Sequence, residues 1–237
     1  MNNGFSKAKH LKITEATNYQ YRTAADFGYL RFDEMTEVLT FGRLKKALNK
    51  TLSAFQDKKG IIIDLRFNGG GWDKTASRIA SRFVAKKQVS YFRKERKKGT
   101  KEYRKLKSFS IKPKGNYQFT QPIIILTSDF TASAAEVFLL TLKDFPYVTI
   151  VGDTTEGIFS EMYEFKLPNK WEVSLSHQQF FSKAMINYEG IGIEPDFKVL
   201  NSRKDVETNI DPVITKAMIL LREYLLFRGE NKLNSSK

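Results

Sequence analysis

One serine hydroxyl stands where a buried strand gives way to a helix. The chain runs from the apolar stretch 123–126 through a polar turn to Ser133, and the helix-forming run Ala134-Ala135-Glu136 follows. The first backbone N–H groups of a helix lack partners within it, and the helix dipole adds partial positive charge there. Negative charge that develops beside Ser133 would be stabilised, as a serine nucleophile requires. A serine at such a junction is also a common helix cap, so both interpretations stay open.

A second buried strand ends in three consecutive glycines. Residues 60–67 form the apolar run, and Asn68 and Gly69-Gly70-Gly71 follow it. Consecutive glycines let the backbone turn tightly and present N–H groups to a ligand without an intervening Cβ. The loop matches neither the phosphate-binding P-loop nor the dinucleotide-binding pattern. A loop that can hold an anion but has no nucleotide motif indicates an oxyanion hole.

Both loops lie within an alternation of strands and helices. Apolar residues at helical or strand spacing predict the elements in order: strand 27–32, helix 41–55, strand 60–67, helix 76–84, a short strand within 107–119, strand 122–126, helix 135–142, strand 147–151, a hairpin over 162–175 and a last helix after Pro212. Alternating strands and helices favour an α/β fold with a mostly parallel sheet and crossover helices. The hairpin, which turns at Pro168-Asn169-Lys170, is an addition to that pattern.

Length and composition fit one domain. With 237 residues, 41% of them hydrophobic, the chain can bury a sizeable core. We expect a polar leader over residues 1–26, a core domain over 27–227 and a frayed tail over 228–237. No apolar run approaches the ~20 residues that a transmembrane helix needs, and residues 1–20 lack the apolar stretch of a signal peptide.

Two residue types limit the chemistry. The chain has no cysteine, which excludes disulfides and thiolate metal sites, and its two histidines, His10 and His177, argue against a metal site built from histidine. The chemistry suggested by Ser133 needs no organic cofactor. We therefore expect neither a metal nor a cofactor.

Positive charge is concentrated in one segment. The formal net charge is +14, and residues 86–107 hold eleven Lys and Arg residues against two Glu residues. Such runs are usually solvated surface, and no nucleic-acid-binding module surrounds this one, so we expect a mobile surface insertion and no nucleic-acid partner. Contact with an acidic peptide or an anionic lipid surface stays open.

Six motifs in order resemble those of the tail-specific, or C-terminal processing, serine peptidases, and more closely the branch that is similar to the tricorn protease core. They span about residues 27–221 and are Gly28-Tyr29-Leu30, Ile63 to Gly71, Leu126-Thr127-Ser128 with Thr131 to Glu136, Val151 to Gly157, Leu167-Pro168-Asn169 and Glu189 to Asp196. The resemblance implies a crotonase-like α/β spiral around a peptide-binding groove. It also implies Ser133 as nucleophile, the backbone N–H groups of Gly71 and Ala134 as oxyanion hole, and Glu189 as the residue that orients the catalytic base.

The base itself is missing from its expected positions. A serine hydroxyl needs a base to become a good nucleophile. The resemblance puts Ile158 at the position of the Lys base of the processing proteases, and Arg31 at the position of the His base of the tricorn-like branch. Arginine stays protonated near neutral pH and cannot accept a proton. His177 and His10 remain as candidates, although a lone histidine more often has a packing or surface role.

The leading interpretation is a serine-type endopeptidase that hydrolyses peptide bonds of unfolded or C-terminal polypeptide segments, with weak activity because the base is missing. One alternative is a family member that has lost catalysis and binds a peptide or an apolar ligand, since the fold is similar to that of interphotoreceptor retinoid-binding repeats. A third is a nucleic-acid or membrane-surface binder acting through residues 86–107. Similar bacterial proteins work in the cell envelope, so we expect the envelope or periplasm. The oligomeric state stays open.

Overall fold

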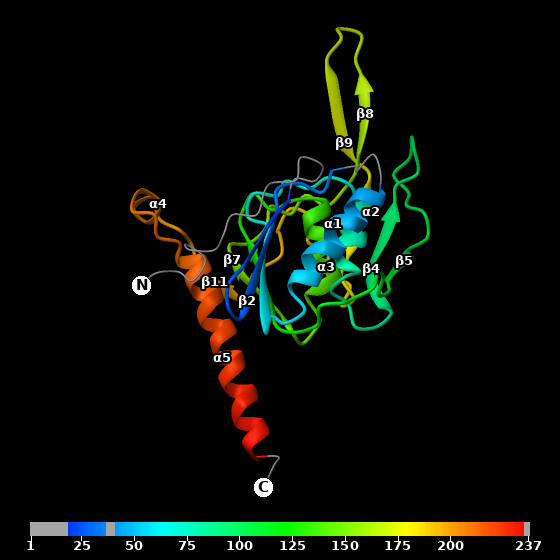
Figure 1. Cartoon of the computed structure of the whole chain (residues 1–237). Helices are drawn as coiled ribbons and strands as arrows, with labels where there is room; N and C mark the ends of the chain where they lie inside the picture. The colour runs from blue at the N-terminus through cyan, green and yellow to red at the C-terminus, as the bar shows by residue number, and fades with distance from the viewer. Residues whose placement is uncertain (1–18, 37–40, 235–237) are drawn as a thin grey trace.

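The structure, a computed structural model, describes residues 19–36 and 41–234 (Figure 1). Its strands are β1 (Tyr19–Thr23), β2 (Phe27–Phe32), β3 (Gly60–Asp64), β4 (Gln88–Glu95), β5 (Lys107–Ile111), β6 (Ile123–Thr127), β7 (Val148–Gly152), β8 (Met162–Lys166), β9 (Glu172–Ser176), β10 (Gln178–Phe181) and β11 (Phe197–Lys198). Its helices are α1 (Phe41–Ala54), α2 (Asp73–Ala80), α3 (Ala134–Leu142), α4 (Arg203–Glu207) and α5 (Pro212–Asn234). The predicted strands and helices are present, and β1, β4, β10, β11 and α4 are additional.

The central sheet has six strands in the order β1-β2-β3-β6-β7-β11. All neighbours are parallel except the edge pair β1 and β2. The two central strands are continuous apolar runs, and every residue from Ile61 to Ile63 and from Ile123 to Leu126 is fully buried. Strands that are buried on both faces read as such runs because parallel sheets are covered by helices on both sides. The predicted α/β class with a mostly parallel sheet is confirmed.

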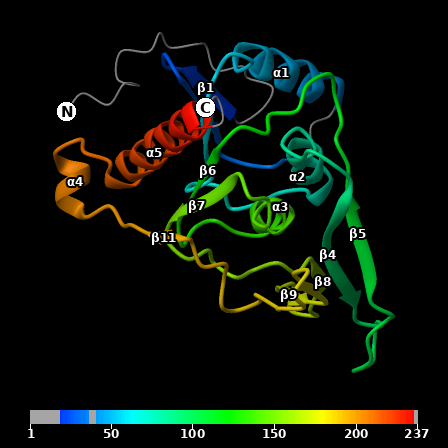
Figure 2. The ribbon, with the colours of Figure 1, turned by 90° about the horizontal axis from the view of Figure 1, so that it is seen from below.

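Helices cover the two faces of the sheet and give the molecule three layers (Figure 2). Helices α1, α2 and α3 lie on one face and α5 on the other. Alternate residues of one strand serve the two cores: Ile61 and Ile63 join the larger cluster, and Ile62 joins the smaller cluster with Leu221 of α5. No helix in the described part of the chain combines the length and apolar character needed to cross a bilayer.

Part of the basic segment is folded rather than a solvated insertion. Strand β4 pairs with both β5 and β10 in a second, antiparallel sheet, and Tyr91 is buried. The guanidinium of Arg93 lies 4.7 Å from the ring centre of Phe109 and 5.4 Å from that of Phe180. Charged side chains can pack over aromatic rings in this way, so a polar sequence still makes an internal strand. Only residues 96–106, here called the basic loop, match the expected surface appendage.

The expected leader and tail also contribute structure. Strand β1 lies within residues 1–26 and pairs with β2, and the Tyr21 ring meets Phe55 edge-on at 6.0 Å. Its five residues are too few and too polar to show a strand pattern without that neighbour. At the other end, the backbone of α5 continues to Asn234, beyond the predicted start of the frayed tail at residue 228. His10 lies outside the described residues.

The hairpin of β8 and β9, here called the arm (residues 162–176), projects far from the body of the molecule in Figure 1. Its predicted turn is present, and the N–H of Leu167 donates to the carbonyl of Trp171 at 2.8 Å. The predicted hairpin is confirmed.

Candidate active site

Ser133 occupies a strained turn at the N-terminus of α3. Its backbone angles are φ 54° and ψ −121°, a region that residues with a side chain rarely adopt. Such strain costs roughly 1–3 kcal/mol and persists only where the surroundings enforce it. Here the N–H of Ser133 donates to the carbonyl of Ile158 at 2.9 Å and to Oε2 of Glu136 at 3.0 Å. The side chain is half-buried, so it remains accessible from the surface.

The glycine loop lies directly against this serine. A Cβ added to Gly70 would lie 2.6 Å from Cβ and 3.1 Å from Oγ of Ser133, and φ at Gly70 is 109°. A Cβ on Gly71, where φ is 137°, would collide with the backbone of Met35 at 2.3 Å. Only glycine allows this approach. The glycine loop and the start of α3 therefore face each other, as an oxyanion hole built from both loops requires.

Gly71 and Ala134 supply backbone N–H groups at the serine and glycine loops, Gly71 from an exposed position and Ala134 from a fully buried one. Among the described residues, no acceptor takes the N–H of Gly71 or the N–H of Ala134. The neighbouring N–H groups are occupied: that of Gly70 donates to Oδ1 of Asn68 and that of Trp72 to the carbonyl of Met35. The free pair matches the residues predicted for the oxyanion hole.

Asn68 fixes the two loops to each other. Asn68 is fully buried, and its Nδ2 donates to the backbone carbonyl of Phe32 at 3.1 Å. The backbone carbonyl of Asn68 accepts the N–H of Ala132 at 3.1 Å. Together with the bond from Gly70, these contacts join β2, the glycine loop and the serine turn. In the sequence, Asn68 is marked only as the start of the loop, although an Asn before glycines often bonds to nearby backbone groups through its side chain.

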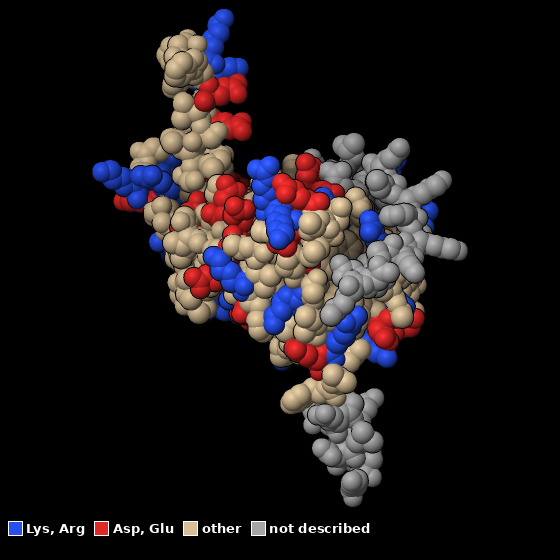
Figure 3. Space-filling view, turned by 90° about the vertical axis from the view of Figure 1, so that its left-hand side faces the viewer, with Lys and Arg blue, Asp and Glu red and all other residues tan. Residues whose placement is uncertain are grey.

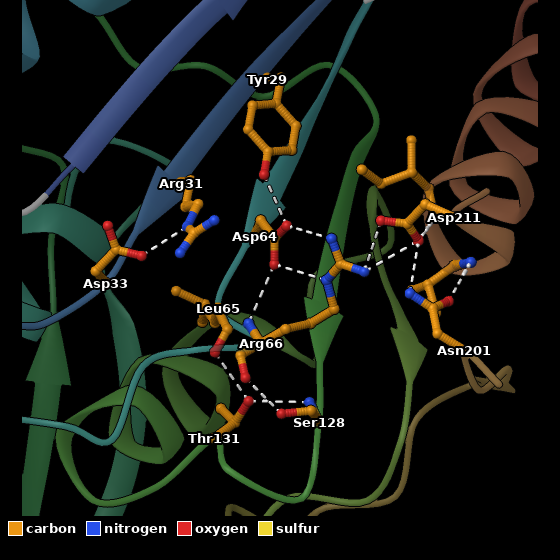
Figure 4. Close-up of polar contacts among 12 residues, drawn as sticks. Tyr29, Arg31, Asp33, Asp64, Leu65, Arg66, Ser128, Thr131, Asn201 and Asp211 are labelled. Carbon is orange, nitrogen blue, oxygen red and sulfur yellow. Dashed lines mark hydrogen bonds and ion pairs between the residues drawn. The ribbon is translucent and has the colours of Figure 1, made fainter. Parts of the chain in front are cut away.

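A buried ion-pair network holds the strand end that carries the glycine loop (Figure 4). Asp64 is 1% exposed and accepts bonds from Tyr29 Oη at 2.7 Å and from Arg66 Nε at 3.0 Å and Nη2 at 2.7 Å. Arg66 also donates from Nη1 to Asp211 at 2.9 Å, just before α5. Burial, together with the nearby Asp64 carboxylate, raises the pKa of Tyr29. The network thus ties the loop to α5 on the far side of the sheet.

Two hydroxyl groups join the serine turn to the same strand end. Thr131 Oγ1 donates to the carbonyl of Leu65 at 2.9 Å, and Ser128 Oγ donates to the carbonyl of Arg66 at 2.5 Å (Figure 4). The carbonyl of Leu65 also accepts the N–H of Asn68 at 2.9 Å, whereas the carbonyl of Arg66 depends on Ser128 among the described contacts. These bonds fix the spacing between the two loops.

Glu136 organises the other side of Ser133. It is fully buried, and its carboxylate accepts the N–H groups of Ser133, Gly157 and Ile158 at 2.9–3.0 Å and the hydroxyl of Thr155 at 2.5 Å. Burial raises the pKa of this carboxyl, while the four donors act in the opposite direction. The role of Glu136 was not predicted from the sequence. The Ser133-x-x-Glu136 spacing of a capping box was the available signal.

Glu189 reaches the same segment but not the serine itself. Its Oε2 accepts the N–H of Phe159 at 3.0 Å, and the N–H of Gly190 donates to the carbonyl of Gly157 at 2.7 Å. Glu189 therefore bonds to Phe159, the residue that follows Ile158. The carbonyl of Ile158 in turn accepts the N–H of Ser133. The described bonds of Glu189 include none to Ser133.

None of the candidate bases contacts Ser133 among the described interactions. The His177 ring is 7% exposed and stacks on the Tyr163 ring with 3.8 Å between their centres. Arg31 Nε bonds Oδ1 of Asp33 at 2.6 Å, and its guanidinium lies over Phe67. Ile158 presents only its backbone to Ser133, and its side chain is 38% exposed.

Comparisons with known proteins agree with this geometry. The family model described as Peptidase family S41 matches residues 26–199. The carboxy-terminal-processing protease of Bartonella bacilliformis is 31% identical over 189 residues, which are 79% of this chain and 42% of that protein. The tricorn protease of Thermoplasma volcanium is 24% identical over 163 residues, which are 68% of this chain and 14% of that protein.

A solved structure shares the fold. The crystal structure of a Parabacteroides merdae protein superposes with a TM-score of 0.79 at 27% identity, covering 91% of this chain and 66% of that one. The chain spans less than half the length of the two curated relatives named above. Since the family model covers most of the chain and the fold agrees, this chain belongs to peptidase family S41.

Proposed function

We propose that the chain is a serine endopeptidase that hydrolyses peptide bonds of unfolded or C-terminal polypeptide segments. In this proposal, Ser133 Oγ attacks the carbonyl carbon of the scissile bond, and the N–H groups of Gly71 and Ala134 bind the oxygen as it becomes negatively charged. The amine leaves with a proton, and water then hydrolyses the acyl-serine. Two rigid backbone donors contribute several kcal/mol to the stability of such an intermediate.

One observation carries the proposal. Ser133 is held in a strained turn against Gly70, with two unbonded backbone N–H groups beside it. A helix cap alone would not require this strain or the close approach of a glycine loop. The family and the name of the Bartonella bacilliformis relative favour polypeptide substrates, including their C-terminal segments.

We further propose that Glu189 orients the base and that His177 is the candidate base. To accept a proton from Ser133, the His177 ring would have to leave its stack on Tyr163. Assistance by a general base usually contributes about 10²–10⁴-fold to the rate, so we expect slow turnover. Oxyanion stabilisation and substrate binding can still support weak hydrolysis without a base.

The test combines a fluorophosphonate probe with hydrolysis of a labelled unfolded protein. We expect slow labelling and slow cleavage, both abolished in Ser133→Ala. Cleavage that is unchanged in Ser133→Ala would remove the assignment of the nucleophile. Rapid labelling and cleavage that His177→Ala abolishes would identify the base and contradict the expected slow turnover.

A second candidate function is a family member without catalysis that binds a peptide or an apolar ligand. The observation that favours it is the replacement of both expected bases, by Ile158 and Arg31. Binding of an unfolded polypeptide without cleavage, in wild type and Ser133→Ala alike, would support this candidate.

Three further assignments belong to the same proposal. We assign residues 27–227 to the peptidase core and its α/β arrangement to a crotonase-like spiral, which successive βα units with parallel strands support. The cell envelope, or periplasm, is the proposed location, suggested by resemblance to bacterial processing proteases. Cell fractionation with an antibody against the chain tests the location.

A further inference from the structure

The arm has one apolar face and one polar face. The cross-strand pairs Tyr163–Leu175 and Phe165–Val173 point to one side, and Leu167 and Trp171 continue that side at the tip. The pairs on the opposite side are Met162–Ser176, Glu164–Ser174 and Lys166–Glu172. In Figure 3 the charged atoms of the arm lie along one side only. The arm is therefore amphipathic, as a sheet with one buried face would be.

The apolar face is nevertheless open to solvent. Trp171 is 72% exposed and Leu175 is 55% exposed, and both edges of this two-stranded sheet are unpaired within the described chain. An isolated hairpin is marginally stable in water, and exposed apolar patches usually mark binding surfaces. The arm is suited to receive another polypeptide.

A groove runs between the arm and the basic loop. Its volume is about 460 Å³, within the usual range for ligand sites. Tyr163, Phe165 and Leu175 line one wall, and Arg96, Lys97 and Lys101 line the other. His177 is buried between the two walls, and its Nδ1 has no hydrogen-bond partner among the residues that the structure describes. An apolar wall thus faces a basic wall.

The base of the arm is bonded to the same segment that holds the proposed catalytic serine. Ser160 Oγ accepts the N–H groups of His177 and Gln178 at the base of the arm, at 3.0 and 2.9 Å. Two residues earlier in the chain, the carbonyl of Ile158 accepts the N–H of Ser133. A polypeptide bound along the groove could therefore extend to the serine.

We propose that this groove docks an extended polypeptide segment in which apolar side chains alternate with acidic ones. Alternate side chains of an extended segment point to opposite sides, so one set would meet the apolar wall and the other the basic wall. An unpaired arm strand can also add the segment as a further strand. This inference rests on the proposed peptidase function and names the class of substrate that the site would select.

A peptide fits these walls better than a nucleic acid does. Bases bind single-stranded sites by stacking on open aromatic faces, but Tyr163 and His177 already stack on each other. Leu175 and Val173, which form the middle of the apolar face, offer no ring for a base, and the exposed rings of Phe165 and Trp171 make single-stranded RNA the competitor that the test must include. A lipid surface would require the basic and apolar groups on one convex patch, whereas here they face each other across a groove.

The test measures binding separately from cleavage. Fluorescence anisotropy follows a labelled peptide of alternating Leu and Glu bound to the Ser133→Ala protein, in which cleavage is prevented. Peptides of alternating Leu and Lys, and of alternating Ser and Glu, test the two walls separately. Leu175→Ser is compared with Met162→Ser, a similarly exposed position on the polar face. The basic-wall variant carries Lys97, Lys98 and Lys101→Gln, and its control carries Arg43, Lys46 and Lys50→Gln on α1.

We expect the Leu–Glu peptide to bind most tightly. Leu175→Ser should weaken its binding about tenfold, because a leucine contact is lost, while Met162→Ser should have little effect. The basic-wall variant should weaken binding and flatten its dependence on salt, and the α1 control should do neither.

Several outcomes would overturn the inference. They are equal binding of the Leu–Lys peptide, equal effects of Leu175→Ser and Met162→Ser, preferred binding of single-stranded RNA or of vesicles containing phosphatidylserine, and a dimer in solution that Leu175→Ser converts to a monomer. If hydrolysis that depends on Ser133 persists while binding ignores both walls, the docking inference fails and the peptidase proposal stands. If the walls bind the peptide as expected but no hydrolysis depends on Ser133, the peptidase proposal fails and the docking inference stands.

Discussion

At the scale of single residues, the candidate site depends on close approach and on buried acceptors. Ser133 is held by Gly70 on one side and by Glu136 and Ile158 on the other. Gly70 and Glu136 are of types that few substitutions can replace, because one must lack a Cβ and the other must accept four bonds, whereas Ile158 contributes only its backbone carbonyl. The same interactions that create the strain at Ser133 therefore also stabilise the turn.

Gly70→Ala tests the close approach. The added methyl group would meet Ser133 at 2.6 Å, and alanine is strained at φ 109°. We expect the free energy of unfolding to fall by about 1–3 kcal/mol or more and fluorophosphonate labelling to be lost. The control is Gly42→Ala in α1, where a Cβ meets no atom within 4 Å, and which should stabilise the helix by roughly 0.5–1 kcal/mol. Equal stability of the two variants would show that the glycine loop can shift to accommodate the added methyl group at little cost.

Glu136→Gln tests the buried acceptor. The amide NH2 group would face at least one backbone N–H donor in place of a carboxylate oxygen, so one or two of the four bonds would be lost, depending on whether the Thr155 hydroxyl turns to accept. We expect a loss of about 2–4 kcal/mol in the free energy of unfolding, measured by urea denaturation. Glu156→Gln, an exposed position in the same segment, should change it by less than about 0.5 kcal/mol. A loss no larger than that of the control would mean that Glu136 does not hold the turn.

At the scale of elements, α2 starts beside the glycine loop with a carboxylate in an unfavourable place. Burial, and then the nearby Glu161, raise the pKa of Asp73 to about 6, while Arg93, 3.5 Å away, acts in the opposite direction. Asp73 Oδ2 has no hydrogen-bond partner among the described residues. The start of α2 is thus destabilised by its charge at neutral pH.

This charge predicts a pH dependence. Because the pKa of Asp73 is higher in the folded state than the ordinary value of 3.8, the folded protein binds the proton more tightly. The contribution of this group to stability therefore improves as pH falls through about 6 and is complete below about 4. Asp73→Asn should raise the free energy of unfolding at pH 8 by roughly 1–3 kcal/mol, less whatever the lost ion pair with Arg93 contributed. At pH 4 the same substitution should change the free energy of unfolding very little.

Urea denaturation across this pH range measures the effect. Asp129→Asn, an exposed position in the serine turn, is the control and should show no such dependence. A destabilised Asp73→Asn at pH 8 would mean that the ion pair with Arg93 outweighs the cost of burial.

At the scale of the whole molecule, α5 on the far face of the sheet supports the site through Asp211 and Arg66. Its apolar residues pack on the central strands, and Leu221 is 1% exposed beside Gly60. The third layer therefore belongs to the same folding unit as the glycine loop.

Leu221→Ala tests whether α5 and the sheet unfold together. It should lower the free energy of unfolding by about 2–5 kcal/mol in one cooperative transition, because a buried leucine leaves a cavity. Leu226→Ala, 69% exposed on the same helix, should stay within about 0.5 kcal/mol. Two separate transitions, or equal effects of the two variants, would mean that α5 is not integral to the core.

The sequence alone determined the elements whose signal is local. The continuous apolar runs at 60–67 and 122–126 predicted buried parallel strands, observed as β3 and β6. The glycine and serine loops that follow them indicated the candidate site, because each pattern reflects only neighbouring residues. Strands β1 and β4 could not be predicted, because their largely polar residues form strands only by pairing, β1 with the following strand β2 and β4 with β5 and the distant β10.

Tertiary structure decided which groups surround the serine. Asn68 bonds to Phe32 and Ala132, and Glu136 bonds to Ile158, so both join segments that are far apart in the chain. The stack of His177 on Tyr163 depends on the register of the arm. A sequence motif lists the residues that can do the chemistry. Whether a base reaches Ser133 is a matter of distances, and those are set by packing between elements.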